Sequence, residues 1–197
     1  MSRRISRATA IGFLLLSALA PRLPAAERVV TLDPKASEVS FTLDTTFHTV
    51  HGTMRLTHGV LRFDSETGAA SGEIEVDARG GETGNGRRDR KMHDAILESA
   101  RFPAIAFRPQ RVAGRVAETG RSDVRLAGAM SLHGADHPMT LPLSVTVDGG
   151  NVKAEARFEV PYVEWGMEDP SFLFVRAEKR VVVSVRAEGR IGAARAP

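Results

Sequence analysis

The sequence contains no cysteine, only one tryptophan and one tyrosine, and no apolar run long enough to cross a membrane as a helix. The lack of cysteine excludes a disulfide framework, a thiolate metal site, a cysteine nucleophile and a lipid-modified N-terminal cysteine. The most apolar segment, residues 8–20, has only 13 residues, whereas a bilayer requires about 20. With 197 residues, of which 42% are hydrophobic, the chain is expected to fold as one globular domain.

The chain also has almost no net charge outside residues 1–26. The formal charge of +3 depends on four arginines that precede Glu27, where no acidic residue occurs. Residues 27–197 carry 23 basic and 24 acidic side chains. The folded part therefore has no excess positive charge to attract a polyanion, and no nucleic-acid partner is expected.

Residues 1–26 have the order of a secretory signal peptide. A basic segment that includes Arg3 and Arg4 precedes the apolar residues 8–20, and small residues follow. We expect cleavage between about residues 20 and 26, export, and a single mature domain over residues 27–197. A retained N-terminal membrane anchor is the alternative, and the two adjacent arginines leave the twin-arginine export route open.

Apolar residues alternate along most of the remaining chain, which predicts β-strands. Val39, Phe41 and Leu43 begin the pattern, and it is strongest over residues 124–132, 139–147, 154–160 and 181–185. The sequence Asp148-Gly149-Gly150-Asn151 predicts a tight hairpin turn. Residues 87–99 break the alternation, and the four-residue spacing of Met92 and Ile96 predicts one short amphipathic helix.

Eight or more antiparallel strands with one helix predict an all-β fold, either a sandwich or a closed barrel. Small residues, among them Gly128, Ala154 and Ala156, fall on inward positions and leave volume unfilled. This favours a barrel of about eight strands, which is just wide enough for one ligand. Pro142 cannot donate a ladder hydrogen bond, so we expect a bulge or a partial opening there.

The inward positions of these strands are the candidate ligand-binding residues, with three further residues expected at the mouth of the barrel. Met92 and Ile96 of the helix and Trp165 of an aromatic-rich loop are assigned to the mouth. The strand positions are Phe41, Leu43, Phe63, Ile74, Val76, Phe107, Leu132, Leu143, Val145, Phe158 and Val183.

The sequence gives weaker evidence for catalysis or metal binding than for an apolar ligand site. Two histidine pairs, His48 with His51 and His133 with His137, lie in predicted turns, and their spacing alone does not define a metal site. Asp89 and His93 are one helical turn apart, but the sequence has no nucleophile elbow to complete a catalytic group. We therefore expect no enzyme activity, no metal and no catalytic residue, with Asp89 anchoring the helix.

Several motifs resemble the YceI-like periplasmic polyisoprenoid-binding proteins. They run in family order over nearly all of residues 28–191. The resemblance implies a lipocalin-like antiparallel barrel in the periplasm, with an apolar tunnel that holds a long isoprenoid or another lipid chain and no other cofactor. Val30 and Trp165 depart from the residues common in the family, which leaves the particular ligand open. The motifs are Leu32-Asp33-Pro34, His51-Gly52-Thr53-Met54, Arg88-Asp89-x-x-Met92-His93, Phe102-Pro103-x-Ile105-x-Phe107, Leu132-His133-Gly134-x-x-His137-Pro138 and Trp165-Gly166.

Three hypotheses of function follow from the sequence. The favoured one is a lipid-binding carrier in the periplasm. The alternatives are a structural or stress-related barrel without an exchangeable ligand, and a metal protein or enzyme that uses the histidines. The sequence leaves transient membrane contact and the oligomeric state open, a dimer included.

The order of basic, apolar and small residues over residues 1–26 gives a direct test of export. The mature protein is expected to begin between Pro21 and Glu27 and to be released with the periplasmic fraction. Intact-mass measurement of the purified protein checks this expectation. A mass that still includes residues 1–20 would contradict it.

Overall fold

The structure is a computed structural model that describes residues 27–171 and 174–193. The predicted signal peptide, residues 1–26, lies outside the described residues. None of the helices within them has the length and apolar character needed to span a bilayer. The strands are β1 (Glu27–Leu32), β2 (Glu38–Asp44), β3 (Thr49–Asp64), β4 (Ala70–Glu82), β5 (Ala104–Ala113), β6 (Gly120–Leu132), β7 (Ala135–Asp148), β8 (Asn151–Val160) and β9 (Val181–Ala193).

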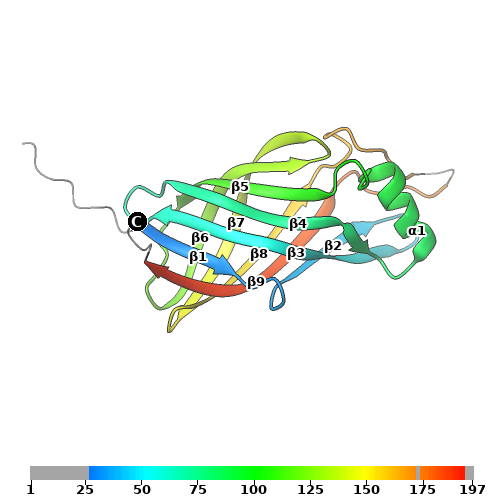
Figure 1. The fold of residues 1–197 in the computed structure, drawn as a ribbon. Coiled ribbons are helices and arrows are strands. Elements are labelled where there is room, and N and C mark those ends of the chain that lie inside the picture. The colour runs from blue at the N-terminus through cyan, green and yellow to red at the C-terminus, as the bar shows by residue number, and fades with distance from the viewer. Residues whose placement is uncertain (1–26, 172–173, 194–197) are drawn as a thin grey trace, which may run out of the picture.

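The nine strands form one closed antiparallel barrel with eight strand positions (Figure 1). Strands β1 and β2 share one position, because both lie between β3 and β9. β1 pairs with the C-terminal parts of these two strands, and β2 pairs with their N-terminal parts. Since β3 also pairs with β4, every strand has a neighbour on both sides. The predicted closed barrel with one short helix is confirmed.

β-Bulges explain why the apolar pattern changes phase within single strands. In β3 the inward residues are first Met54 and Leu56 and then Leu61 and Phe63, and the register of pairing with β4 shifts between these two pairs. The extra residue of a bulge moves inward positions from even to odd numbers. The sequence pattern therefore resembles two short strands where the structure has one of 16 residues.

The hairpins follow the predicted turn chemistry. Gly149 and Gly150 both have positive φ, as the two-residue turn between β7 and β8 requires. In the turn between β6 and β7, His133 and Gly134 take the same role, with φ of 53° and 80°. This places His133 at the tip of the hairpin.

The barrel wall is weakest where the sequence predicts an opening. β7 pairs with β8 only from Leu143 to Asp148, whereas residues 135–142 pair with β6 alone. Pro142 is the first residue without a partner in β8, which agrees with the absence of a donor on its nitrogen. The seam between β7 and β8 is consequently unpaired over the half of β7 that precedes Leu143.

The helix lies at one end of the barrel, opposite the C-terminal end (Figure 1). It consists of α1 (Gly86–Lys91) followed by one wider turn, η1 (Met92–Ile96), in which the Leu97 N–H donates to the Met92 carbonyl. The Asn85 side chain caps α1 by accepting from the amides of Arg87 and Arg88. We call this end, which also carries the β2–β3 turn and residues 161–171 and 174–180, the capped end.

Candidate functional site

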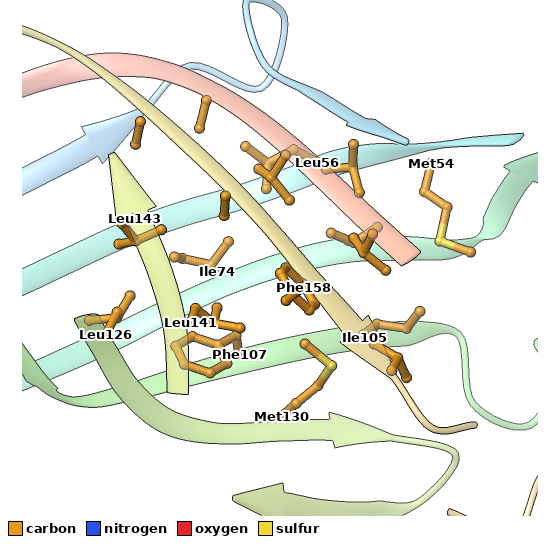
Figure 2. Close-up of a pocket in the computed structure, with 18 of the residues that line it drawn as sticks. Met54, Leu56, Ile74, Ile105, Phe107, Leu126, Met130, Leu141, Leu143 and Phe158 are labelled. Atoms are coloured by element: carbon orange, nitrogen blue, oxygen red, sulfur yellow. The ribbon is translucent and has the colours of Figure 1, made fainter. Parts of the chain in front are cut away.

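The interior of the barrel holds an apolar cavity of about 280 Å³, to which all nine strands contribute side chains. Figure 2 shows Ile74, Phe107, Leu141 and Phe158 converging on this space from four different strands. Small residues help to keep it open, because Ala154 and Ala156 of β8 occupy positions where a larger side chain would fill it. The volume lies near the lower end of the range for small-molecule sites.

Thirteen of the fourteen predicted binding residues lie around this cavity. Eleven are strand residues that line its wall as expected, and Met92 and Ile96 cover it from the helix. The residues are Phe41, Leu43, Phe63, Ile74, Val76, Met92, Ile96, Phe107, Leu132, Leu143, Val145, Phe158 and Val183. Their contact with a ligand stays a prediction.

Trp165 is the exception, because it packs outside the cavity lining. Its ring stacks on the His137 ring of β7, with the centroids 3.9 Å apart and the planes within 3° of parallel. Three other residues of the same loop, Tyr162, Met167 and Pro170, contribute to the lining instead. The sequence marks this loop by its aromatic residues but has no periodicity there to tell which side chain points inward.

The lining has almost no polar chemistry. Only Ser37 and Tyr162 carry a hydroxyl group, and both hydroxyls are already bonded to backbone carbonyls. The Ser37 hydroxyl donates to Asp33 at 2.7 Å, and the Tyr162 hydroxyl donates to Glu178 at 2.8 Å. The cavity therefore offers a ligand apolar contact and no free hydrogen-bonding group from these side chains.

The helix is held over the capped end by a polar network around Thr83. The Asp89 carboxylate accepts from the Thr83 amide at 2.9 Å and from the Thr83 hydroxyl, and Arg88 Nη2 donates to the Thr83 carbonyl at 2.9 Å. This is the anchoring role predicted for Asp89. Its carboxylate is directed to Thr83, and no hydrogen bond links it to His93 in the described residues.

His93 fixes the end of the helix to the barrel. Its Nε2 lies 2.9 Å from the Gly81 carbonyl, which can only accept, so Nε2 carries the proton and donates. Its Nδ1 lies 3.0 Å from the hydroxyl oxygen of the buried Ser99. The bond to Gly81 holds η1 against β4, and the contact with Ser99 joins η1 to the residues that follow it.

The other histidines are dispersed. His51 Nδ1 lies 3.3 Å from the Thr42 hydroxyl, whereas His133 Nε2 lies 2.8 Å from a Glu98 carboxylate oxygen. Over residues 27–171 and 174–193, no three histidine, aspartate or glutamate side chains gather as a metal site would require. His51 and His133 thus each contact a side chain other than the second histidine of the predicted pair.

His137 has an unusual environment beneath Trp165. Its Nε2 atom is buried and has no hydrogen-bond partner among the described residues. A buried polar atom without a partner usually destabilises a fold by about 1–3 kcal/mol. The stacked tryptophan covers the ring without supplying an acceptor for this atom.

A closed antiparallel barrel around a continuous apolar cavity defines a class of proteins that enclose small hydrophobic molecules. The sequence matches the YceI-like domain over residues 30–189, and the chain belongs to this family. No curated protein sequence matches the chain.

Two solved structures illustrate the likeness. A polyisoprenoid-binding domain from Saccharophagus degradans, implicated in plant cell wall breakdown, has 16% identity and a TM-score of 0.62, covering 85% of this chain and 99% of its own. BcnA from Burkholderia cenocepacia has 13% identity and a TM-score of 0.65, covering 82% of this chain and 99% of its own. At these identities the likeness establishes the fold.

The ionisation of the Tyr162 hydroxyl tests whether water is excluded from the capped end. Burial raises the pKa of its hydroxyl to about 12, with smaller contributions from the negative charges of Asp169 and Glu178. Because the folded protein keeps a proton that the unfolded chain loses near its usual value of 10.0, stability is expected to fall as the pH rises from about 10 to about 12. Absorbance titration follows this group alone, since the chain has one tyrosine. Ionisation near pH 10 in the folded protein would contradict the burial.

His137 provides a second test. His137→Phe keeps an aromatic ring under Trp165 and removes the unpartnered nitrogen, so the free energy of unfolding is expected to stay the same or rise by about 1 kcal/mol. Chemical denaturation measures the change, with His137→Ala as the matched control that loses the stack and is expected to be less stable than His137→Phe. A clear loss of stability in His137→Phe would show that the nitrogen has a partner in solution.

Proposed function

We propose that the protein is a periplasmic carrier that holds a long-chain isoprenoid, or another lipid with a long apolar chain, inside the barrel. The observation that carries the proposal is the apolar cavity, whose two hydroxyl groups are both bonded to the protein backbone. A ligand for such a space must itself be apolar over the enclosed length, because any enclosed polar group would lose its hydrogen bonds to water. The polyisoprenoid-binding domain among the structural neighbours supports this ligand class.

The energetics favour carrying over permanent retention. Transfer of an alkyl chain from water into the cavity stabilises the complex by roughly 0.8 kcal/mol for each CH₂ group. A chain drawn from a bilayer is already in an apolar medium, so the net gain is much smaller. The barrel is thus suited to protect the chain from water during transfer and then to release it.

The capped end is the proposed route for the ligand. Two segments cover the cavity there, η1 with Met92 and the loop with Tyr162 and Met167. They are joined by a hydrogen bond from Lys91 Nζ to the Pro170 carbonyl, 3.2 Å long. Neither segment belongs to the barrel sheet, so both can move without breaking strand pairing. Phe172, which follows this part of the sequence, lies outside the described residues.

A binding role agrees better than catalysis with the chemistry of the lining. Tyr162 is the only titratable residue that contributes to the lining, and its raised pKa keeps it protonated at neutral pH. General acid–base catalysis needs a group whose pKa lies near the working pH. We therefore propose a binding protein and no enzyme activity for the barrel.

Export and domain organisation complete the proposal. Residues 1–26 would direct the chain to the periplasm and be removed, and the barrel that begins with β1 would be the mature protein. An isoprenoid carrier in this compartment would cross an aqueous space between membranes, which agrees with an apolar cavity inside a barrel.

The proposal is tested by isolating the protein with its ligand. Protein purified without detergent is expected to show a mass excess in native mass spectrometry, and organic solvent should extract a molecule with a long apolar chain. Extraction of such a molecule at near-stoichiometric yield would support the carrier. Protein that is empty, and that also fails to take up an added long-chain prenol, would contradict it and favour a structural barrel.

A large side chain placed in the cavity should reduce lipid binding without unfolding the protein. Ala154→Phe places a ring in the cavity, so lipid content is expected to fall at least tenfold, while the apolar surroundings accept the ring at a cost of about 1–3 kcal/mol. Lys153→Phe is the matched control, because the same residue then points outward from an exposed neighbouring position. Organic extraction and thermal unfolding are measured for both variants. Equal lipid content in the two would show that the chain does not occupy this part of the barrel.

A further inference from the structure

Three large apolar side chains are exposed on the described part of the protein, and all three lie at the capped end. Phe47 is 70% exposed, Phe174 is 84% exposed and Val175 is 38% exposed. Single exposed apolar residues are ordinary, whereas a group of them at one place marks an interaction surface. We call these three residues the apolar tip.

The apolar tip is built by two segments that are held side by side. The Thr46 amide donates to the Arg176 carbonyl at 2.9 Å, and the Arg176 amide donates to the Thr46 hydroxyl at 2.9 Å. A further bond runs from the Glu178 amide to the Asp44 carbonyl, also at 2.9 Å. Phe47 follows Thr46 directly, and Val175 precedes Arg176, so these bonds hold the two segments that carry the exposed side chains next to each other.

The apolar tip adjoins the proposed route into the cavity. The β2–β3 turn follows Leu43, and the segment with Phe174 leads to Val181; both Leu43 and Val181 line the cavity. Figure 1 shows the end of β2, the residues before β9 and α1 at the same end of the barrel. A surface that covers the apolar tip would therefore face the mouth.

Exposed cations lie at this end, among exposed acidic residues such as Glu82, Asp94 and Glu178. Arg176 and Lys179 belong to the segment that carries the apolar tip, and Arg87, Arg90 and Lys91 belong to α1; all five are exposed. None of the five makes an ion pair in the part of the chain that the structure describes. Glu178, which lies between Arg176 and Lys179 in the sequence, is also exposed. Asp169 is occupied by its hydrogen bonds to Ser171, which together with these two cations lower its pKa.

We infer that the apolar tip inserts into the surface of a phospholipid bilayer that contains anionic lipids, while the surrounding cations contact the headgroups. Projecting aromatic and aliphatic side chains with basic neighbours have the chemistry of an interfacial membrane anchor. A protein partner is a poorer match, because three side chains at loop tips cover far less than the area of a stable protein interface. The inference rests on the proposed function, since docking would place the mouth of the barrel against the source of the lipid chain.

Vesicle flotation tests the docking. The purified, delipidated protein is expected to float with mixed phosphatidylcholine and phosphatidylglycerol vesicles, and to float less as the salt concentration rises. The double variant Phe47→Ser, Phe174→Ser should lower partitioning about tenfold or more, because two rings no longer leave water. Since both side chains are exposed, unfolding of this variant is expected to match the wild type. Undiminished flotation of the double variant would overturn the inference.

A matched pair of charge variants tests the orientation. Arg90→Gln with Arg176→Gln removes two cations from the capped end, whereas Arg62→Gln with Arg115→Gln removes two exposed cations from strand and loop positions at the other end. Only the first pair is expected to reduce flotation with anionic vesicles. Equal effects of both pairs would indicate general electrostatic attraction and contradict docking by the capped end.

Transfer of a pyrene-labelled dodecanoic acid separates this inference from the proposed function. Uptake from donor vesicles should slow at least tenfold in the Phe47→Ser, Phe174→Ser variant, whereas uptake from dilute aqueous solution should be unchanged. If the wild type takes up the probe from solution but never floats with vesicles, the docking is wrong and the carrier function stands. If it takes up no probe from either source, the carrier function is wrong. A change in molecular mass without flotation would assign the tip to contact between copies of the chain.

Discussion

Closure of the sheet is the constraint on which the rest of the structure depends. A sheet edge exposes unpaired N–H and C=O groups, and the barrel removes these edges by giving each strand two neighbours. The division of one strand position between β1 and β2 makes this closure possible with nine strands. Once the wall is closed, alternate side chains of every strand must enter one shared interior, and that interior has to be apolar because it is separated from water.

The cavity is a consequence of this closure combined with an incomplete filling. Phe107 and Phe158 project into the interior, but Ala154 and Ala156 leave space beside them. A tighter core would be more stable, because unfilled space loses dispersion contacts. The protein therefore retains an arrangement that is less favourable when empty and more favourable when an apolar chain supplies the missing contacts, as expected for a binding protein.

The capped end is held together by different interactions from those of the barrel wall. Its two covering segments are held by a few hydrogen bonds, such as the one from Lys91 to the Pro170 carbonyl, rather than by continuous strand pairing. The same end presents Phe47 and Phe174 to the surroundings. A cover held by few hydrogen bonds and exposed apolar side chains are unfavourable for a simple container, whereas both would serve the proposed carrier, which would receive its ligand from a membrane. The structure concentrates these features at one end of the barrel.

The sequence by itself determined most of the strands and the inward set that includes Phe41, Phe107 and Phe158, because a period of two assigns each residue to one face of a sheet. It favoured a closed barrel over a sandwich, and the pairing of β3 with β4 decided between them. Only the tertiary structure decided which loop residues cover the cavity. The sequence favours Trp165, yet Trp165 stacks on His137 while Tyr162 and Met167 point inward. An irregular loop has no fixed period, so its side chains are oriented by neighbours distant in the sequence. The phase shifts in β3 and the pairing of the segments that carry Phe47 and Phe174 depend in the same way on contacts between separate parts of the chain.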